Sequence, residues 1–322
     1  MKVALTGASG LVGSRFFDLL KSKYEIIPIS STFGIDITDK KKIHKFLSNR
    51  KPSVIVHMAA KTHVDSCEND RKEDIFKTKK SKVVKGSELE LDNLDENDWK
   101  DSNSAFGINV VGTKNVADYA RENDTPMIYI STDFVFNGEK NGEYTEEDLP
   151  NPINWYGQTK LWGEKTLPQD ALITRMSYPY GYKSQIKKDF VWGLADILLN
   201  QDIARLVSDQ IITPTFIDDA VWGLDFLMGK NVRGLVNLVG NNFLSPYEIG
   251  IAISRELGLS EIKLDTTTRE KLYAGRARRP FKVMLKNDKL RALGFQMTDF
   301  YDTLQVIMGR PHPQPSPLGR GK

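Results

Sequence analysis

The sequence lacks the residues on which secreted, membrane-spanning and metal-centred proteins depend. One cysteine among 322 residues, Cys67, excludes an intramolecular disulfide and a cysteine-clustered zinc site, and fits a reducing compartment. Four scattered histidines give no basis for a histidine-rich metal site, and we predict no bound metal from these residues. No apolar run approaches the roughly 18 residues of a membrane span, and the chain opens with MKVALTG rather than a leader peptide. We therefore expect a soluble, unexported, cytoplasmic protein with no membrane partner.

An excess of one charge is also missing once the C-terminal tail is set aside. The formal charge is +3, from 45 Lys+Arg and 42 Asp+Glu. Arg310, Arg320 and Lys322 account for this excess, so residues 1–309 carry 42 basic and 42 acidic side chains. With no basic helix and no nucleic-acid motif, we expect no nucleic-acid partner. Proline and glycine dominate the end of the chain, and we predict that residues 310–322 are disordered.

Short apolar segments alternate with amphipathic segments of helical length. We predict strands near residues 3–5, 24–29, 54–56, 126–130 and 171–175, and helices near 11–21, 39–49 and 105–122. Continuous apolar strands separated by helices are typical of a parallel sheet covered on both faces. The fold class is therefore α/β, a doubly wound parallel Rossmann sheet, with a smaller C-terminal subdomain.

Two regions follow from this arrangement. We expect residues 1–175 to form the sheet domain, to which segments near 203–243 partly return, and residues 176–309 mainly to form the C-terminal subdomain. Residues 70–104, the charged segment, interrupt the rhythm, because 18 of the 32 residues from Asp70 to Asp101 are charged. Basic residues precede acidic ones there, so we expect a surface insertion with little core: a solvated loop, or a hairpin or helix pair folded by its own opposite charges.

The first strand runs into GASGLVG, which places Gly7, Gly10 and Gly13 directly before a helix. A tight turn that brings amide groups against a pyrophosphate at a helix N-terminus needs residues without a Cβ atom. The position of this turn, at the end of the first strand, predicts a dinucleotide site.

The end of the second strand indicates which dinucleotide is preferred. An NAD site usually has an acidic residue there for the ribose 2′-hydroxyl, but this chain has Ser30 and no acid before Asp36. We therefore predict NADP(H), while NAD(H) stays open because no arginine lies nearby. Asp36 and Ile37 are expected at the adenine, although Asp36 also suits a turn or helix cap. Small residues after the third strand, Ala59 and Ala60, reach the same sheet edge.

Three polar residues form a catalytic pattern. Thr132 ends a strand, and Tyr156 and Lys160 are four residues apart on one helix face. An ammonium group beside a phenol favours the phenolate, so we predict that Lys160 lowers the pKa of Tyr156 towards neutrality. Thr132 would hydrogen-bond the reacting oxygen.

These motifs together resemble the extended short-chain dehydrogenase/reductase superfamily and, within it, the dTDP-4-dehydrorhamnose reductases. The resemblance runs from residue 1 to about 309 apart from the charged segment. It rests on GASGLVG, HMAAKTHVDSCE, INVVGTKNVAD, STDFVFNG, YGQTKLWGE, RMSYPYG, TPTFIDDA and RRPFKVMLKNDKLRALGF. It implies NADPH-dependent reduction of the 4-keto group of a nucleotide-linked 6-deoxyhexose, as in dTDP-L-rhamnose synthesis. It also implies that residues 1–175 are the NADP(H)-binding domain and that residues 176–309 mainly form a substrate-binding subdomain.

The resemblance also assigns residues by position. Thr132, Tyr156 and Lys160 would be catalytic, and Asp133 and Tyr178 would contact the substrate. The family often has Trp where Tyr178 stands, which leaves the sugar and base specificity open. Cofactor contacts would come from Gly10, Leu11, Val12, Asp36, Ile37, Ala59, Ala60, Lys61 and Thr62.

Two further side chains bear on the substrate. Dehydratases of the superfamily have an Asp-Glu pair after the catalytic threonine, and this chain has Asp133-Phe134, which disfavours dehydration. Arg279, in a basic cluster expected to cap the cleft, is a candidate for the substrate diphosphate, although a solvated basic face is an equal alternative.

Other functions stay open. The chain could be a reductase or epimerase of another nucleotide sugar, or a non-catalytic NADP-binding regulatory subunit resembling the β subunit of methionine adenosyltransferase. Members of the family can form homodimers, in some cases through Mg²⁺, but no residue cluster here identifies such a site.

Overall fold

The chain was analysed as a computed structural model, which describes residues 1–85, 88–90, 93–183, 187–259 and 264–309. The tail predicted to be disordered, residues 310–322, lies outside the described residues.

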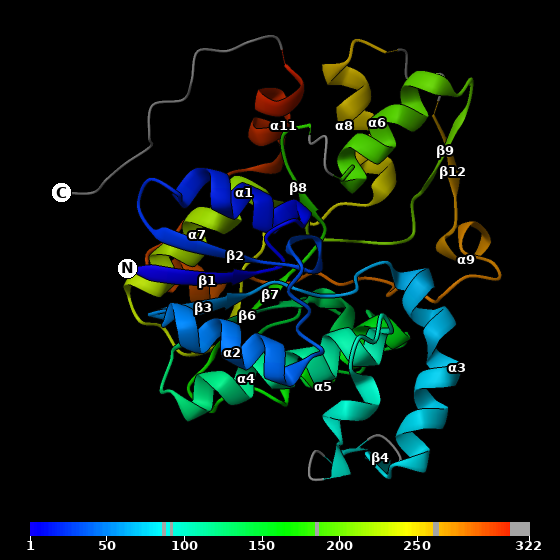
Figure 1. Cartoon of the computed structure of the whole chain (residues 1–322). Helices are drawn as coiled ribbons and strands as arrows, with labels where there is room; N and C mark the ends of the chain where they lie inside the picture. Colours follow the sequence, from blue (N-terminus) through cyan, green and yellow to red (C-terminus); the bar gives the residue numbers. More distant parts are fainter. Residues whose placement is uncertain (86–87, 91–92, 184–186, 260–263, 310–322) are drawn as a thin grey trace.

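A six-stranded parallel sheet forms the centre of the molecule (Figure 1). Its strand order is β11-β7-β6-β3-β1-β2. The strands are β1 (Lys2–Thr6), β2 (Glu25–Ile29), β3 (Val54–His57), β6 (Met127–Thr132), β7 (Leu172–Met176) and β11 (Gly234–Asn237). All pairs within it are parallel, which confirms the predicted doubly wound fold. The carboxyl ends of β1, β3 and β6 meet at one edge, because Thr6 pairs with His57 and His57 with Tyr129.

Helices cover both faces of the sheet. The helices α1 (Leu11–Leu20) and α7 (Ile217–Gly229) lie on one side, and α2 (Lys40–Arg50), α4 (Thr113–Glu122) and α5 (Trp155–Glu164) lie on the other (Figure 1). Alternation along β1 explains this, since Leu5 packs with the α1–α7 side while Ala4 packs with the α2–α4 side. Both side chains are fully buried.

The helix predicted near 105–122 is divided in two. It begins as a π-helix, η4 (Gly107–Gly112), and continues as α4. The wider turn directs the buried Asn109 side chain to Lys61 and Thr159: its Oδ1 accepts from Lys61 N at 2.8 Å and its Nδ2 donates to Thr159 Oγ1 at 3.0 Å. Such π-segments often mark functional sites.

The second half of the chain has its own core, at the upper right of Figure 1. Its helices are α6 (Phe190–Asn200), α8 (Pro246–Glu256) and α11 (Phe300–Met308). Short parallel pairs join β8 (Pro179–Tyr180) to β10 (Thr215–Phe216) and β9 (Ala204–Val207) to β12 (Leu264–Thr267). The short helix α9 (Arg269–Leu272) follows β12, whereas α10 (Asp288–Ala292) packs Leu290 into the core of the large sheet. Within residues 203–243, α7 packs against the large sheet and β11 pairs with β7 in it. By contrast, β9 pairs with β12 outside that sheet.

The charged segment is structured. It contains most of α3 (Val64–Lys80), a hairpin of β4 (Val84–Lys85) and β5 (Glu88–Leu89), and a 3₁₀ turn, η3 (Glu96–Trp99). The expectation that it supplies little core is wrong, because Val83, Leu94 and Trp99 are buried against Trp155 and Trp162 of α5 and nearby residues.

The opposite charges of this segment do not hold it together as expected. Among its described residues, no ion pair joins the basic half to the acidic half. Glu96 instead pairs with Lys40 and Lys114, and Lys100 pairs with Asp39. The segment is therefore attached to the sheet domain by charge as well as by apolar packing.

Across the described ranges, no helix combines the length and the apolar character that a membrane crossing requires.

Candidate functional site

One cavity of about 820 Å³ runs along the carboxyl ends of the strands. Nearly all of the residues predicted from the sequence line it together: Gly7, Gly10, Leu11, Val12, Gly13, Ser30, Asp36, Ile37, Ala59, Ala60, Thr62, Thr132, Asp133, Tyr156, Lys160 and Tyr178. Two predicted residues, Lys61 and Arg279, are not among its lining residues. A cleft at this edge is where ligands bind in open α/β sheets.

The glycine turn has the geometry that a dinucleotide requires. Gly7 has a φ of +71°, and a Cβ there would lie 2.7 Å from Ala59 N. A Cβ on Gly13 would lie 2.2 Å from Gly7 O, so the helix and the turn meet through backbone alone. No side chain caps α1 and no acidic residue stands in its first turn. The first turn of α1 therefore meets the cavity, at Leu11 and Val12, with no side chain capping its N-terminal amide groups.

The end of β2 carries hydroxyl groups. Ser30 caps η1 (Ser31–Phe33) by accepting from Phe33 N at 3.3 Å, and Ser31 also lines the cavity. Asp36 Oδ1 accepts from both Thr38 N and Thr38 Oγ1 at 2.8 Å. The turn role that the sequence left open for Asp36 is therefore present, together with its place in the cavity wall.

Lys61 supports the cavity from outside. Its Nζ donates to Asn103 O at 2.9 Å and pairs with Asp70 at 2.7 Å. Lys61 therefore fastens the charged segment to the loop after β3.

Side chains that cap α5 and η5 fix the backbone that carries the catalytic candidates. The Asn154 side chain caps α5 by accepting from Gly157 N at 2.8 Å, which fixes the first turn that carries Tyr156. Thr132 similarly caps η5 (Asp133–Val135) by accepting from Phe134 N at 3.3 Å. Lys160 Nζ donates to Ile130 O at 2.7 Å and lies 4.0 Å from the centroid of the Tyr129 ring.

Burial controls the protonation of these groups. It raises the pKa of Tyr156 above its ordinary value, and the hydrogen bond with Thr132 offsets only part of this effect. Burial lowers the pKa of Lys160 to about 7, although Glu164 acts in the opposite direction. The prediction that Lys160 lowers the pKa of Tyr156 is wrong for this structure, because desolvation of the phenol raises this pKa and only the hydrogen bond with Thr132 lowers it.

Asp133 and Tyr178 form the far wall of the cavity. Burial raises the pKa of Asp133 to about 6, against hydrogen bonds from Ser177 Oγ at 2.9 Å and Thr132 Oγ1 at 3.1 Å. Tyr178 has a φ of +40°, a strained conformation for a residue with a Cβ, and residues of this kind concentrate at functional sites.

Phe134 packs between these groups. Its ring centroid lies 5.5 Å from that of Tyr156 and 6.1 Å from that of Tyr178. The position after Asp133 is thus an apolar contact in the cavity wall, where a dehydratase would carry a carboxylate.

Two lysines in the cavity were missed by the sequence reasoning. Lys187 and Lys188 line it ahead of α6, and Lys187 Nζ donates to Thr62 Oγ1 at 3.3 Å on the opposite wall. A pair of lysines before a helix is an ordinary surface feature, so the sequence offered no signal for this placement.

Arg279 is engaged elsewhere. Its guanidinium pairs with Asp65, which also pairs with Arg276 at 2.6 Å and accepts from Ala277 N at 3.1 Å. The Arg279 guanidinium holds the pKa of Asp65 well below its usual range. These contacts join the loop of residues 276–279 to the first turn of α3.

Buried polar side chains lie beneath the site. Glu164 forms a bidentate pair with Arg175 at 3.0 and 2.8 Å. His57 contacts Thr6 Oγ1 at 2.7 Å and Thr113 Oγ1 at 3.1 Å, and burial lowers its pKa to about 3. The sequence reasoning did not identify these pairs, because residues far apart in the chain form them. No group of three or more metal-binding side chains was found among the residues that the structure describes.

A model of the family described as RmlD substrate binding domain matches residues 1–83 and 93–310. The chain belongs to this family. The gap in the match, residues 84–92, falls within the charged segment.

Relatives agree with the RmlD assignment. A dTDP-4-dehydrorhamnose reductase of Aggregatibacter actinomycetemcomitans is 29% identical, over 95% of this chain and 98% of the relative. The solved dTDP-4-dehydrorhamnose reductase of Bacillus anthracis in complex with NADP is 26% identical with a TM-score of 0.79, over 95% of this chain and 98% of the other. Methionine adenosyltransferase 2 subunit beta of Rattus norvegicus is 27% identical, over 93% of this chain and 84% of the relative.

Proposed function

We propose that this chain is an NADPH-dependent reductase of a nucleotide-linked 4-keto-6-deoxy sugar, with an activity like that of the dTDP-4-dehydrorhamnose reductases. One observation carries the proposal: Thr132, Tyr156 and Lys160 line the same continuous cavity as the glycine turn. A relative from A. actinomycetemcomitans bears this name, and the B. anthracis relative was solved with NADP.

The residues at the glycine turn fit a dinucleotide. The uncapped N-terminus of α1 offers amide groups to a pyrophosphate, and Gly7 and Gly13 let the turn, the loop after β3 and the helix meet through backbone. Ser30 and Ser31 offer hydroxyls to a 2′-phosphate, while the Asp36 carboxylate accepts hydrogen bonds from Thr38. This favours NADP(H) over NAD(H), which stays an alternative. When bound, NADPH would supply the hydride for the carbonyl carbon.

The chain's own residues would handle the proton and the carbonyl oxygen. Tyr156, whose raised pKa keeps it protonated at neutral pH, would donate its proton to the forming alkoxide. Thr132 would hydrogen-bond the same oxygen. Lys160 would hold the ribose of the nicotinamide and keep its ammonium near Tyr156. Asp133 and Tyr178 would position the sugar.

Cations for the substrate diphosphate are available in the cavity and beside it. Lys187 and Lys188 line the cavity, but Lys188 pairs with Asp196. Arg279 is paired with Asp65 and would have to share or exchange that partner. We therefore propose Lys187 as a phosphate contact beside the sequence prediction of Arg279.

A second candidate function rests on the methionine adenosyltransferase relative. A non-catalytic subunit of that kind could retain the same cofactor cavity while doing no chemistry. A reductase or epimerase of another nucleotide sugar is the remaining alternative. A cytoplasmic location and a homodimer, with or without Mg²⁺, stay predictions of the sequence and its family resemblance.

A substrate screen separates these candidates. Purified protein is mixed with NADPH or NADH and with dTDP-linked and other nucleotide-linked 4-keto-6-deoxy sugars, and cofactor oxidation is followed by absorbance. The reductase proposal predicts turnover with a dTDP-linked 4-keto sugar and a preference for NADPH. Tight binding of NADPH without turnover of any sugar would support the regulatory subunit instead.

A further inference from the structure

The charged segment reaches the cofactor cavity. Its last residues, Asp101, Ser102 and Asn103, lie among the lining residues, although the sequence predicted only a surface insertion. Asp101 has a φ of +56°, so the backbone is strained where it meets the cavity.

This end of the segment lies between two cofactor loops. On one side Lys100, adjacent to Asp101, pairs with Asp39 at 3.3 Å, and Asp39 follows the Asp36–Thr38 turn. On the other side Asn103 O accepts from Lys61 Nζ at 2.9 Å, beside Ala59 and Ala60. The first loop carries Asp36 and Ile37, which are expected at the adenine, and the second carries Ala59 and Ala60, which are expected to contact the cofactor.

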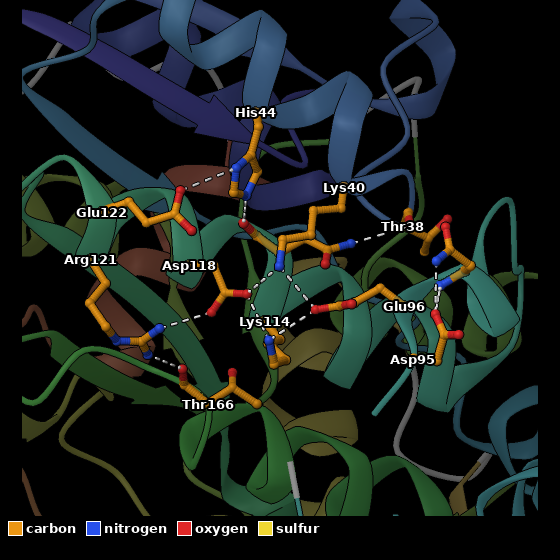
Figure 2. Close-up of polar contacts among 12 residues, drawn as sticks. Thr38, Lys40, His44, Asp95, Glu96, Lys114, Asp118, Arg121, Glu122 and Thr166 are labelled. Atoms are coloured by element: carbon orange, nitrogen blue, oxygen red, sulfur yellow. Dashed lines mark hydrogen bonds and ion pairs between the residues drawn. The ribbon is translucent and has the colours of Figure 1, made fainter. Parts of the chain in front are cut away.

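Just before Asp101 in the chain, a cluster of four charged side chains attaches the segment to the sheet domain (Figure 2). Glu96 Oε1 accepts from Lys40 at 3.0 Å and from Lys114 at 3.1 Å, and Asp118 Oδ2 accepts from the same two lysines at 3.0 and 2.7 Å. Figure 2 shows Glu96 facing Lys40 and Lys114 across the junction. The Glu96 and Lys114 side chains are only 22% and 16% exposed, so solvent screens this contact less than an open surface pair.

The chemistry of the three residues suits the adenine base and the ribose of the cofactor. A carboxylate, a hydroxyl and an amide can pair with the amino group of adenine and with ribose hydroxyls. We propose that Asp101, Ser102 and Asn103 form the outer wall of the adenosine end of the cofactor cavity, and that Glu96 holds this wall in place through Lys40 and Lys114. This inference rests on the proposed function in that it assumes a dinucleotide in the cavity.

Two variants separate contact from positioning. Asp101→Asn removes a charged acceptor while keeping a side chain that tolerates the left-handed backbone. Glu96→Gln removes the anchoring charge without touching the cavity. The matched control is Glu73→Gln, which breaks an exposed pair with Lys77 in the same segment.

Calorimetric titration with adenosine 2′,5′-bisphosphate and with NADPH tests the proposal. We expect each variant to weaken both ligands about five-fold, since a charge-assisted hydrogen bond or its positioning is lost. Glu73→Gln should stay within about two-fold of the wild type. In the reductase assay Glu96→Gln should raise the KM for NADPH and leave kcat within about two-fold.

Each failure has its own meaning. If wild-type protein binds both ligands and both variants bind them equally well, the inference is overturned even if Glu96→Gln lowers the melting temperature, because the role is then only structural. If Glu96→Gln does not fold, Asp101→Asn alone decides, with unchanged affinity counting against the wall. If the wild type binds neither ligand, the proposed function and this inference fall together.

Discussion

The ammonium group of Lys160 lies over the ring of Tyr129, with Nζ 4.0 Å from the ring centroid. The same Nζ donates to Ile130 O at 2.7 Å, so both contacts come from the strand that ends in Thr132. A cation over an aromatic face is stabilised, but the lost hydration still dominates and lowers the pKa of Lys160 to about 7. The protonation of Lys160 therefore changes within the range in which an enzyme is assayed.

This gives a pH dependence for the reductase. Lys160 carries its charge below its pKa and loses it above, so kcat/KM for reduction should fall as the pH rises through about 7. Tyr156 stays protonated across this range because its pKa is raised. The measurement is kcat/KM from pH 5.5 to 9 for the wild type and for Lys160→Met, which should be about 100-fold slower and lack the inflection. A flat wild-type profile across pH 7 would contradict the assignment.

Gly157 sets the distance between Tyr156 and Thr132. A Cβ on Gly157 would lie 2.0 Å from Phe134 O, so Gly157→Ala must push α5 away from η5. We expect a loss of stability of about 1–3 kcal/mol and a drop in kcat, measured by urea unfolding and by the reductase assay. The control is Gly193→Ala in α6, where a Cβ meets nothing within 4 Å and should be neutral or mildly stabilising. Equal behaviour of the two variants would refute the packing argument.

Trp99 tests whether the charged segment is a packed part of the fold. It is 1% exposed and its ring lies 4.7 Å from that of Phe106. Trp99→Ala should cost about 3–5 kcal/mol and make the segment a site of early proteolysis. Phe76→Ala, at a ring of the same segment that is 70% exposed, should change little. If Trp99→Ala lowered the free energy of unfolding by less than about 1 kcal/mol, the charged segment would be better described as a solvated loop.

A substitution of Lys187 tests the proposed contact with the substrate diphosphate. Removal of its ammonium group in Lys187→Ala should raise the KM for the sugar nucleotide about five- to ten-fold, since a charge beside a phosphate is lost. Lys183→Ala is the control, because Lys183 is exposed, stacks over Trp192 and does not line the cavity. If Arg279→Ala raises this KM and Lys187→Ala does not, the sequence prediction is the better one.

Much of the site could be predicted because its residues lie in short motifs at the ends of predictable strands and helices. The glycine turn, Thr132 and the Tyr156–Lys160 pair can be recognised from their spacing in the sequence, without the tertiary structure. Parallel strands bring these ends together at one edge, so their meeting follows from the fold class.

The parts that could not be predicted depend on contacts between distant segments. Asp101 and Lys187 reach the cavity only because the charged segment and the chain before α6 fold back over it. Trp99 is a single aromatic residue in an acidic stretch, and its burial follows from partners in another part of the chain. The raised pKa of Tyr156 depends on how completely the site is buried, which spacing does not reveal.

The most direct test of the account is a comparison of wild-type protein with Tyr156→Phe. Both are given NADPH and dTDP-4-keto-6-deoxy-L-mannose, and NADPH oxidation is measured at saturating concentrations of both. Loss of the phenolic proton donor should lower kcat by about 10²–10⁴-fold while NADPH still binds. A Tyr156→Phe protein as active as the wild type would contradict the proposed chemistry.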